Sequence, residues 1–171
     1  MYQDYKDLLS AFHAHGVEYL IVGGYAVIFH AQPRYTKDLD FFIRADPANA
    51  LATYAALAEF GAALQDIRPE EFAERGSFFR FGTDPRGFDI LPEIPGLDFE
   101  AAWERRVEGV IDPESGLTAF FISAEDLVTA KLAAGRPQDL ADVYAIRNAA
   151  ESLSGRGRRQ RTVQGTGETD G

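Results

Sequence analysis

Several features are missing from this sequence, and each absence excludes a class of protein. The 171 residues include no cysteine, which excludes disulfide bonds, thiolate zinc sites and thiol catalysis. No run approaches the roughly 20 apolar residues of a membrane span, and the N-terminal residues lack the basic start and apolar core of a signal peptide. We therefore expect a cytoplasmic protein without a membrane partner.

Basic residues are also scarce, since 17 Lys and Arg stand against 27 Asp and Glu, for a net charge of -10. Broad non-specific binding to nucleic acids needs many cations to neutralise phosphates, so this class is disfavoured. A local site for tRNA stays open. Residues 151–171 predict a disordered polar and basic tail, which either helps to hold RNA or a partner or is only a solvated terminus.

The remaining residues, 1–150, predict one domain, because 46% hydrophobic residues suffice for a proper core. Strands and helices mix along the chain, which predicts the α/β (α+β) class with a mixed β-sheet, flanking helices and a C-terminal helix pair over 123–150. The expected helices before that pair cover 4–15, 24–31, 47–60 and 99–105, and the expected strands cover 18–22, 38–43, 77–83, 88–91, 107–111 and 117–122.

Two aspartates, Asp38 and Asp40, stand at the start of the apolar strand that ends at Ile43. Residues i and i+2 of a strand point to the same face, so both carboxylates project together from an apolar support. Repulsion and desolvation make such a pair unfavourable unless a cation neutralises it, and hard oxygen ligands suit Mg²⁺ or Mn²⁺. Because Mg²⁺ is usually shared with substrate phosphates, the pair predicts a nucleotide site.

Gly23 and Gly24 lie between a predicted strand and a predicted helix. A turn of this kind exposes backbone N–H groups and the positive end of the helix dipole, and the missing β-carbons let a phosphate approach. Alone, such a pair more often marks only a tight connection. Followed closely by the aspartates, it predicts that the turn holds a triphosphate whose metal the carboxylates bind.

A third carboxylate, Asp89, lies inside the second strand of a hairpin whose turn is Asp84-Pro85-Arg86-Gly87. A charged residue in an apolar run needs a partner or a metal. Two alternatives stay open: Asp89 joins the metal site, or it forms a structural salt bridge, with Arg80 across the hairpin as one candidate.

The C-terminal helix pair contributes cations near the corner formed by Gly135 and Pro137. Lys131 and Arg136 either face the site and complement a triphosphate, or Lys131 is solvated and Arg136 pairs with a nearby aspartate. Arg34 and Thr36 precede the metal strand, where they either contact phosphate or acceptor or are solvated loop residues.

Taken together, Gly23-Gly24, the segment from Arg34 to Asp40, and Phe88-Asp89-Ile90 resemble the signature of the polymerase-β-type nucleotidyltransferase superfamily. Within it, the chain is similar to small bacterial nucleotidyltransferase-like proteins related to AbiEii-type toxins and to the minimal nucleotidyltransferases. The resemblance covers roughly residues 15–147. Many members carry Gly-Ser at the turn, with the serine hydroxyl helping to hold the triphosphate, whereas this chain has Gly24.

The resemblance implies transfer of a nucleoside monophosphate from a nucleoside triphosphate to an acceptor hydroxyl, with release of pyrophosphate. Asp38, Asp40 and Asp89 would hold Mg²⁺ or Mn²⁺, with Asp89 also helping to deprotonate the acceptor. The nucleotide ligands would be Gly23, Gly24, Thr36, Lys131 and Arg136.

For the acceptor we expect a macromolecule, tRNA or a cognate protein, and the resemblance implies a toxin whose partner is an antitoxin. Two alternatives remain: an antibiotic-modifying nucleotidyltransferase, and a catalytically inactive nucleotide-binding or regulatory protein. No residue pattern selects which triphosphate binds.

Overall fold

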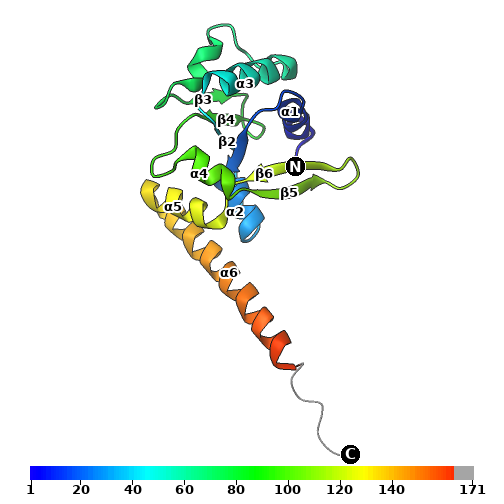
Figure 1. The fold of residues 1–171 in the computed structure, drawn as a ribbon, viewed down its shortest axis with the longest axis vertical. Helices are drawn as coiled ribbons and strands as arrows, with labels where there is room; N and C mark the ends of the chain where they lie inside the picture. Colours follow the sequence, from blue (N-terminus) through cyan, green and yellow to red (C-terminus); the bar gives the residue numbers. More distant parts are fainter. Residues whose placement is uncertain (164–171) are drawn as a thin grey trace, which may run out of the picture.

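A six-stranded mixed sheet forms the centre of the fold in the computed structural model, which describes the backbone of residues 1–163 and the side chains of residues 1–155 (Figure 1). Its strands are β1 (Tyr19–Val22), β2 (Leu39–Ile43), β3 (Phe79–Phe81), β4 (Phe88–Leu91), β5 (Val107–Asp112) and β6 (Leu117–Phe121). They lie in the order β3-β4-β2-β1-β6-β5. The α/β class, with a mixed sheet and flanking helices, is confirmed.

The strand directions bring three separate parts of the chain together at the same end of the central strands β1, β2 and β4. β2 is antiparallel to β1 and parallel to β4, and β1 is parallel to β6. β3 and β4 form the expected antiparallel hairpin. In β1 every residue is buried, and in β2 every residue except Asp40 is buried, because elements cover both faces of these central strands.

The helices are α1 (Gln3–Ala14), α2 (Gly23–His30), α3 (Pro47–Phe60), α4 (Phe99–Glu104), α5 (Ala124–Ala134) and α6 (Pro137–Val163), with a short 3-10 helix, η1 (Pro69–Ala73), which the sequence did not predict. In the tertiary structure α1 packs on α3, while α2 contacts both α5 and α6. The α5–α6 pair therefore lies against the helix that follows the glycine turn, as Figure 1 shows.

Capping chemistry places the helix ends where the sequence predicted them. Asp46 accepts the backbone N–H of Asn49 at 2.7 Å at the start of α3, and Gly61 ends that helix with φ +92°. Ser123 caps α5 by accepting the N–H of Asp126 at 3.1 Å, and Gly135 ends it with φ +66°. The turn at Gly135 joins α5 to α6, which packs against α5 and α2.

α6 continues further than the sequence predicted. The expected disordered tail starts at residue 151, whereas the helix runs to Val163 and projects from the body of the molecule (Figure 1). Once a helix has formed, each added residue gains a backbone hydrogen bond. The helix therefore extends beyond the residues that pack against the rest of the protein. Residues 164–171 of the expected tail lie outside the described residues. Across the part that is described, no helix is both long and apolar enough to cross a membrane.

Candidate active site

A row of charged side chains crosses three neighbouring strands on one face of the sheet. Asp40 of β2 stands opposite Asp89 of β4, and Asp89 stands opposite Arg80 of β3. On its other side Asp40 pairs with Val22, the last residue of β1. Register partners share a face, so the glycine turn that follows Val22 begins beside the row of carboxylates.

Gly23 touches the site so closely that no other residue fits. Its φ is +66°, and a β-carbon added there would lie 2.1 Å from Oδ2 of Asp40. Both the left-handed backbone and the close approach require glycine. The start of α2 therefore lies directly against the Asp40 carboxylate.

Burial and like charge make the Asp40 carboxylate costly. Burial, followed by the neighbouring charges of Asp89 and Asp38, raises the pKa of Asp40 to about 7, while Lys131 lowers it. Asp38 lies just before β2, and its pKa is also raised, first by burial and then by Asp89 and Asp84. The protein alone does not compensate these carboxylates, and a divalent cation with a preference for oxygen ligands would.

Asp89 is already paired. Arg80 donates from Nε and Nη2 to its two carboxylate oxygens at 2.9 and 3.0 Å. Among the residues whose side chains are described, no three His, Asp or Glu side chains stand ready around a common point for a metal ion. The oxygen donors of Asp38 and Asp40 fit a divalent cation such as Mg²⁺ or Mn²⁺.

Two adjoining hollows open over this row. The polar hollow, of about 270 Å³, is lined by Gly23, Gly24, Arg34, Thr36, Lys37 and Gln138 together with the residues it shares with its neighbour. The apolar hollow, of about 450 Å³, has a wall formed by Leu91, Ile94, Pro95, Leu127, Ala130 and Ala134, and it also contains Asp89. Shared by both are Gly23, Asp38, Asp40, Lys131, Arg136 and Asp139.

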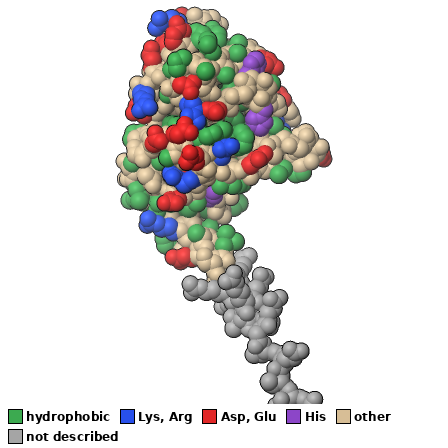
Figure 2. Space-filling model, viewed as in Figure 1, with side chains coloured by type: hydrophobic (Ala, Val, Ile, Leu, Met, Phe, Trp, Pro, Cys, Tyr) green, Lys and Arg blue, Asp and Glu red, His purple; other side chains and the backbone are tan. Residues whose placement is uncertain are grey.

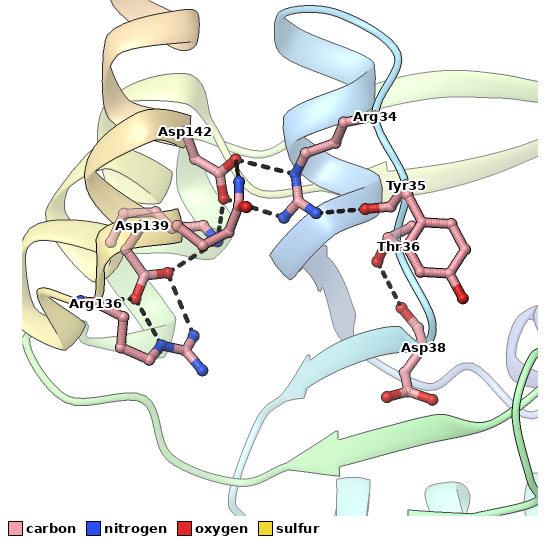
Figure 3. A network of polar contacts seen from close by, with 9 residues as sticks. Arg34, Tyr35, Thr36, Asp38, Arg136, Asp139 and Asp142 are labelled. Carbon is pink, nitrogen blue, oxygen red and sulfur yellow. Dashed lines mark hydrogen bonds and ion pairs between the residues drawn. The ribbon is translucent and has the colours of Figure 1, made fainter.

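Lys131 and Arg136 line both hollows and also pair with aspartates. The pairing of Arg136 is the one that the sequence left open, whereas the solvated alternative for Lys131 is wrong, because Lys131 is buried. The Nζ atom of Lys131 lies 3.1 Å from Oδ1 of Asp139 and 2.8 Å from Oδ2 of Asp142. Arg136 donates from Nε to Oδ2 of Asp139 at 2.7 Å (Figure 3). The helix pair therefore brings two held cations to the shared part of the site.

A third cation joins the same network from the other side of the polar hollow. Arg34, in the loop between α2 and β2, donates from Nη2 to Oδ2 of Asp142 at 3.0 Å, and its Nε lies 2.9 Å from Oδ1 (Figure 3). Gln138 also donates to Asp142, at 3.0 Å. Asp139 and Asp142 are only 1% and 2% exposed, so two buried carboxylates orient three cations.

The sequence missed Asp139 and Asp142 as members of the site. A signal was present, because they share the helical face of the buried residues Val143 and Ile146. Aspartates at buried positions of an amphipathic helix need partners. Their spacing indicated pairing with Arg136, but nothing in the sequence indicated contact with Arg34, which lies far away along the chain.

Comparison with known protein families identifies the family of this chain. A family model described as a nucleotidyltransferase of unknown function (DUF6036) matches residues 3–151. The chain belongs to this family. The prediction of a nucleotidyltransferase is thereby confirmed, and this nucleotidyltransferase has the carboxylate row and the glycine turn at one edge of its sheet.

A solved structure with the same fold is the crystal structure of the lincosamide antibiotic adenylyltransferase LnuA with lincomycin bound. The two superpose with a TM-score of 0.54 at 16% sequence identity, over 87% of this chain and 98% of LnuA. At this identity the likeness establishes the fold alone. Among curated proteins, no sequence matches this nucleotidyltransferase.

Proposed function

We propose that this nucleotidyltransferase moves a nucleoside monophosphate from a nucleoside triphosphate to a hydroxyl group and uses a divalent cation, Mg²⁺ or Mn²⁺, to do so. The observation that carries the proposal is the uncompensated Asp40 carboxyl, with a pKa near 7, packed against the glycine turn. Membership of a nucleotidyltransferase family supports the reaction class.

The residues divide the chemistry between them. Asp38 and Asp40 would hold the metal, which when bound would neutralise the charge that develops on the transferring phosphoryl group. Backbone N–H groups of Gly23 and Gly24 point from the start of α2 toward the phosphates. Lys131 and Arg136 add positive charge in the space shared by both hollows.

Asp89 lies on the acceptor side in this proposal, because it lines the apolar hollow and not the polar one. Once released by Arg80, it accepts the proton of the acceptor hydroxyl while that oxygen bonds to the α-phosphorus and pyrophosphate leaves. Positioning dominates such transfers, so no nucleophilic side chain is needed.

The apolar hollow favours a small acceptor with an apolar body. One wall consists of aliphatic side chains, which suit an apolar body. The cations of this hollow, Arg80, Lys131 and Arg136, stand beside the carboxylates of Asp38, Asp40, Asp89, Glu93 and Asp139, so the hollow presents no net positive charge to a polyanion. On the face seen in Figure 2, acidic and basic side chains lie interleaved and form no single basic field. LnuA, whose structure holds lincomycin, offers a precedent on this fold for a small-molecule acceptor. The tRNA or protein acceptor, the toxin role and the antitoxin stay predictions from the resemblance.

The test supplies purified protein with Mg²⁺, each α-labelled nucleoside triphosphate in turn, and a cell lysate. Products are separated into RNA, protein and small-molecule fractions. With the wild type we expect a new labelled compound in the small-molecule fraction, separable from the triphosphate and its hydrolysis products, and with Asp40→Asn we expect none. Asp112→Asn, which changes a carboxylate of β5 outside both hollows, is the matched control and should retain transfer.

Label in RNA or protein alone would support the proposed transferase activity and contradict the proposal of a small-molecule acceptor. Triphosphate binding without any transfer or pyrophosphate release would favour the regulatory alternative. Full transfer by Asp40→Asn would contradict the metal assignment.

A further inference from the structure

We propose that Thr36 donates its hydroxyl to the triphosphate at the glycine turn, and that position 24 is glycine because this hydroxyl fills the space a side chain would need. The inference rests on the proposed function and deepens it. It makes residues 24 and 36 one phosphate-binding pair, contributed by two different segments of the chain.

The two glycines of the turn are glycines for different reasons. Gly23 has a left-handed backbone, with φ +66°, whereas Gly24 does not have a positive φ. The backbone at position 24 therefore accepts any L-residue, and the restriction there is one of space. A β-carbon on Gly24 would lie 2.3 Å from Oγ1 of Thr36 and 2.6 Å from its Cβ.

Two atoms cannot lie that close together, so a side chain at position 24 and the Thr36 side chain exclude each other. The third neighbour of that β-carbon, Nη2 of Arg34, is 3.2 Å away and belongs to the same loop as Thr36. No backbone atom is among the three nearest neighbours. The space beside Gly24 is therefore shaped by side chains of the loop between α2 and β2.

The Thr36 hydroxyl is available to a ligand. It donates to the carbonyl oxygen of Asp38 at 3.5 Å, a distance at the outer limit of a hydrogen bond. Thr36 lines the polar hollow together with Gly23, Gly24 and the cations of the network. A hydroxyl beside a helix N-terminus and several cations is placed to donate to a phosphate oxygen.

The loop that carries Thr36 is held in place. Arg34 donates from Nη1 to the carbonyl oxygen of Tyr35 at 2.7 Å while its other atoms contact Asp142 (Figure 3). Thr36 thus has a fixed position before any ligand arrives, and its branched Cβ restricts the hydroxyl to few rotamers. Pre-ordering of this kind strengthens binding, because little freedom is lost on contact.

The test measures binding of Mg²⁺ complexes of ATP, GTP, CTP, UTP and inorganic tripolyphosphate by calorimetry, with thermal unfolding beside it. Thr36→Val keeps the side-chain shape and removes the donor, so we expect affinity to fall about tenfold or more. The loss should be equal for tripolyphosphate and for the tightest-binding nucleotide, because the hydroxyl contacts phosphate. Thr36→Ser keeps the donor and should bind within about threefold of the wild type.

A reciprocal exchange tests the shared space. Gly24→Ser alone introduces the clash with Thr36, and both affinity and melting temperature should fall. Adding Thr36→Gly to Gly24→Ser removes both clashing atoms, Oγ1 and Cβ, and returns a hydroxyl to the site, so both quantities should rise above those of Gly24→Ser. Thr36→Gly alone is the matched control, and it should bind weakly.

Wild-type affinity in Thr36→Val would overturn the proposal, as would a double variant no better than Gly24→Ser. A loss confined to nucleotides and absent for tripolyphosphate would move the hydroxyl to the sugar or base and also overturn it. Failure of the proposed function has a different appearance, since the wild type itself would then bind none of these ligands, and the inference would fall with it.

Discussion

The half-buried carboxyl of Asp40 has its pKa raised from 3.8 to about 7, first by desolvation and then by Asp89 and Asp38. In the native state this group therefore holds a proton that the unfolded chain has lost, over the window between those two values. Stability of the metal-free protein falls as pH rises through the window, and the full penalty is present above about pH 7.

We predict that Asp40→Asn stabilises the metal-free protein, since the amide stays neutral at every pH. The gain at pH 8 should be on the order of 1–3 kcal/mol and should shrink toward zero at pH 4. Thermal unfolding in the presence of EDTA at both pH values measures it. Saturating Mg²⁺ should reverse the order by stabilising the wild type. A variant that melts below the wild type at pH 8 would refute the account.

Single residues also mark how far sequence alone reaches. Asp38, Asp40 and the glycines were predictable because their spacing along a strand and a turn fixes local geometry. The contact of Arg80 with Asp89 was one of two open alternatives, and the structure has it at 2.9 Å. The space that Gly24 shares with Thr36 was not predictable, since it depends on how a loop returns to a helix.

At the scale of elements, α6 is tied to the loop between α2 and β2 through one buried side chain, Asp142. It contacts Lys131 of α5, Arg34 of the loop and Gln138 of its own helix. Removal of its charge leaves Arg34 without its carboxylate partner and Lys131 with Asp139 alone. The arrangement of the polar hollow therefore depends on α6, a helix that follows the last strand of the sheet in the sequence.

We predict that Asp142→Asn lowers the free energy of unfolding by about 2–4 kcal/mol, because breaking a buried ion pair strands its partners. Affinity for Mg²⁺-nucleotide should fall as well, since Arg34 and Lys131 lose their orientation. Chemical denaturation and calorimetry measure the two quantities.

Asp126→Asn is the matched control for Asp142→Asn. Asp126 is also buried and accepts both donors of Arg105, at 3.0 and 2.7 Å, but it lines neither hollow. It should lose stability and keep nucleotide affinity. Equal effects of both variants on affinity would mean that the network serves folding alone.

Elements differ in how predictable they were. The bounds of α3 followed from its cap, Asp46, and its stop, Gly61, because capping is a local interaction. The extent of α6 beyond residue 150 did not follow, since the sequence there is polar and carries glycines. A helix continues because each residue adds to a turn that is already formed and packed. The amino-acid composition of the added residues does not reveal that such a turn precedes them.

At the scale of the whole molecule, the polar hollow and the apolar hollow lie side by side over the central strands and share the carboxylates of Asp38, Asp40 and Asp139. The polar hollow gathers cations from the loop and the helix pair, while the apolar hollow lies between β4 and α5. The glycine turn, the pair Asp38 and Asp40, and the carboxylate Asp89 come from separate parts of the chain. Their order across the sheet follows from strand topology, which the sequence predicted only as a mixed sheet.

The separation predicts a variant that loses transfer and keeps nucleotide binding. Ala130 of α5 is half-buried and lines only the apolar hollow, so Ala130→Phe narrows the proposed acceptor space from a position outside the polar hollow. Transfer to small hydroxyl compounds should fall at least tenfold, whereas Mg²⁺-nucleotide affinity should stay within about twofold, because Gly24 and Thr36 line only the polar hollow.

Leu132→Phe provides the matched control, since Leu132 is 48% exposed on the same helix and lines neither hollow. It should leave both quantities unchanged. If Ala130→Phe instead abolishes nucleotide affinity and leaves pyrophosphate release per bound nucleotide intact, the apolar hollow holds the nucleobase. The acceptor would then approach Asp89 from solvent, which is the geometry that a macromolecular acceptor requires.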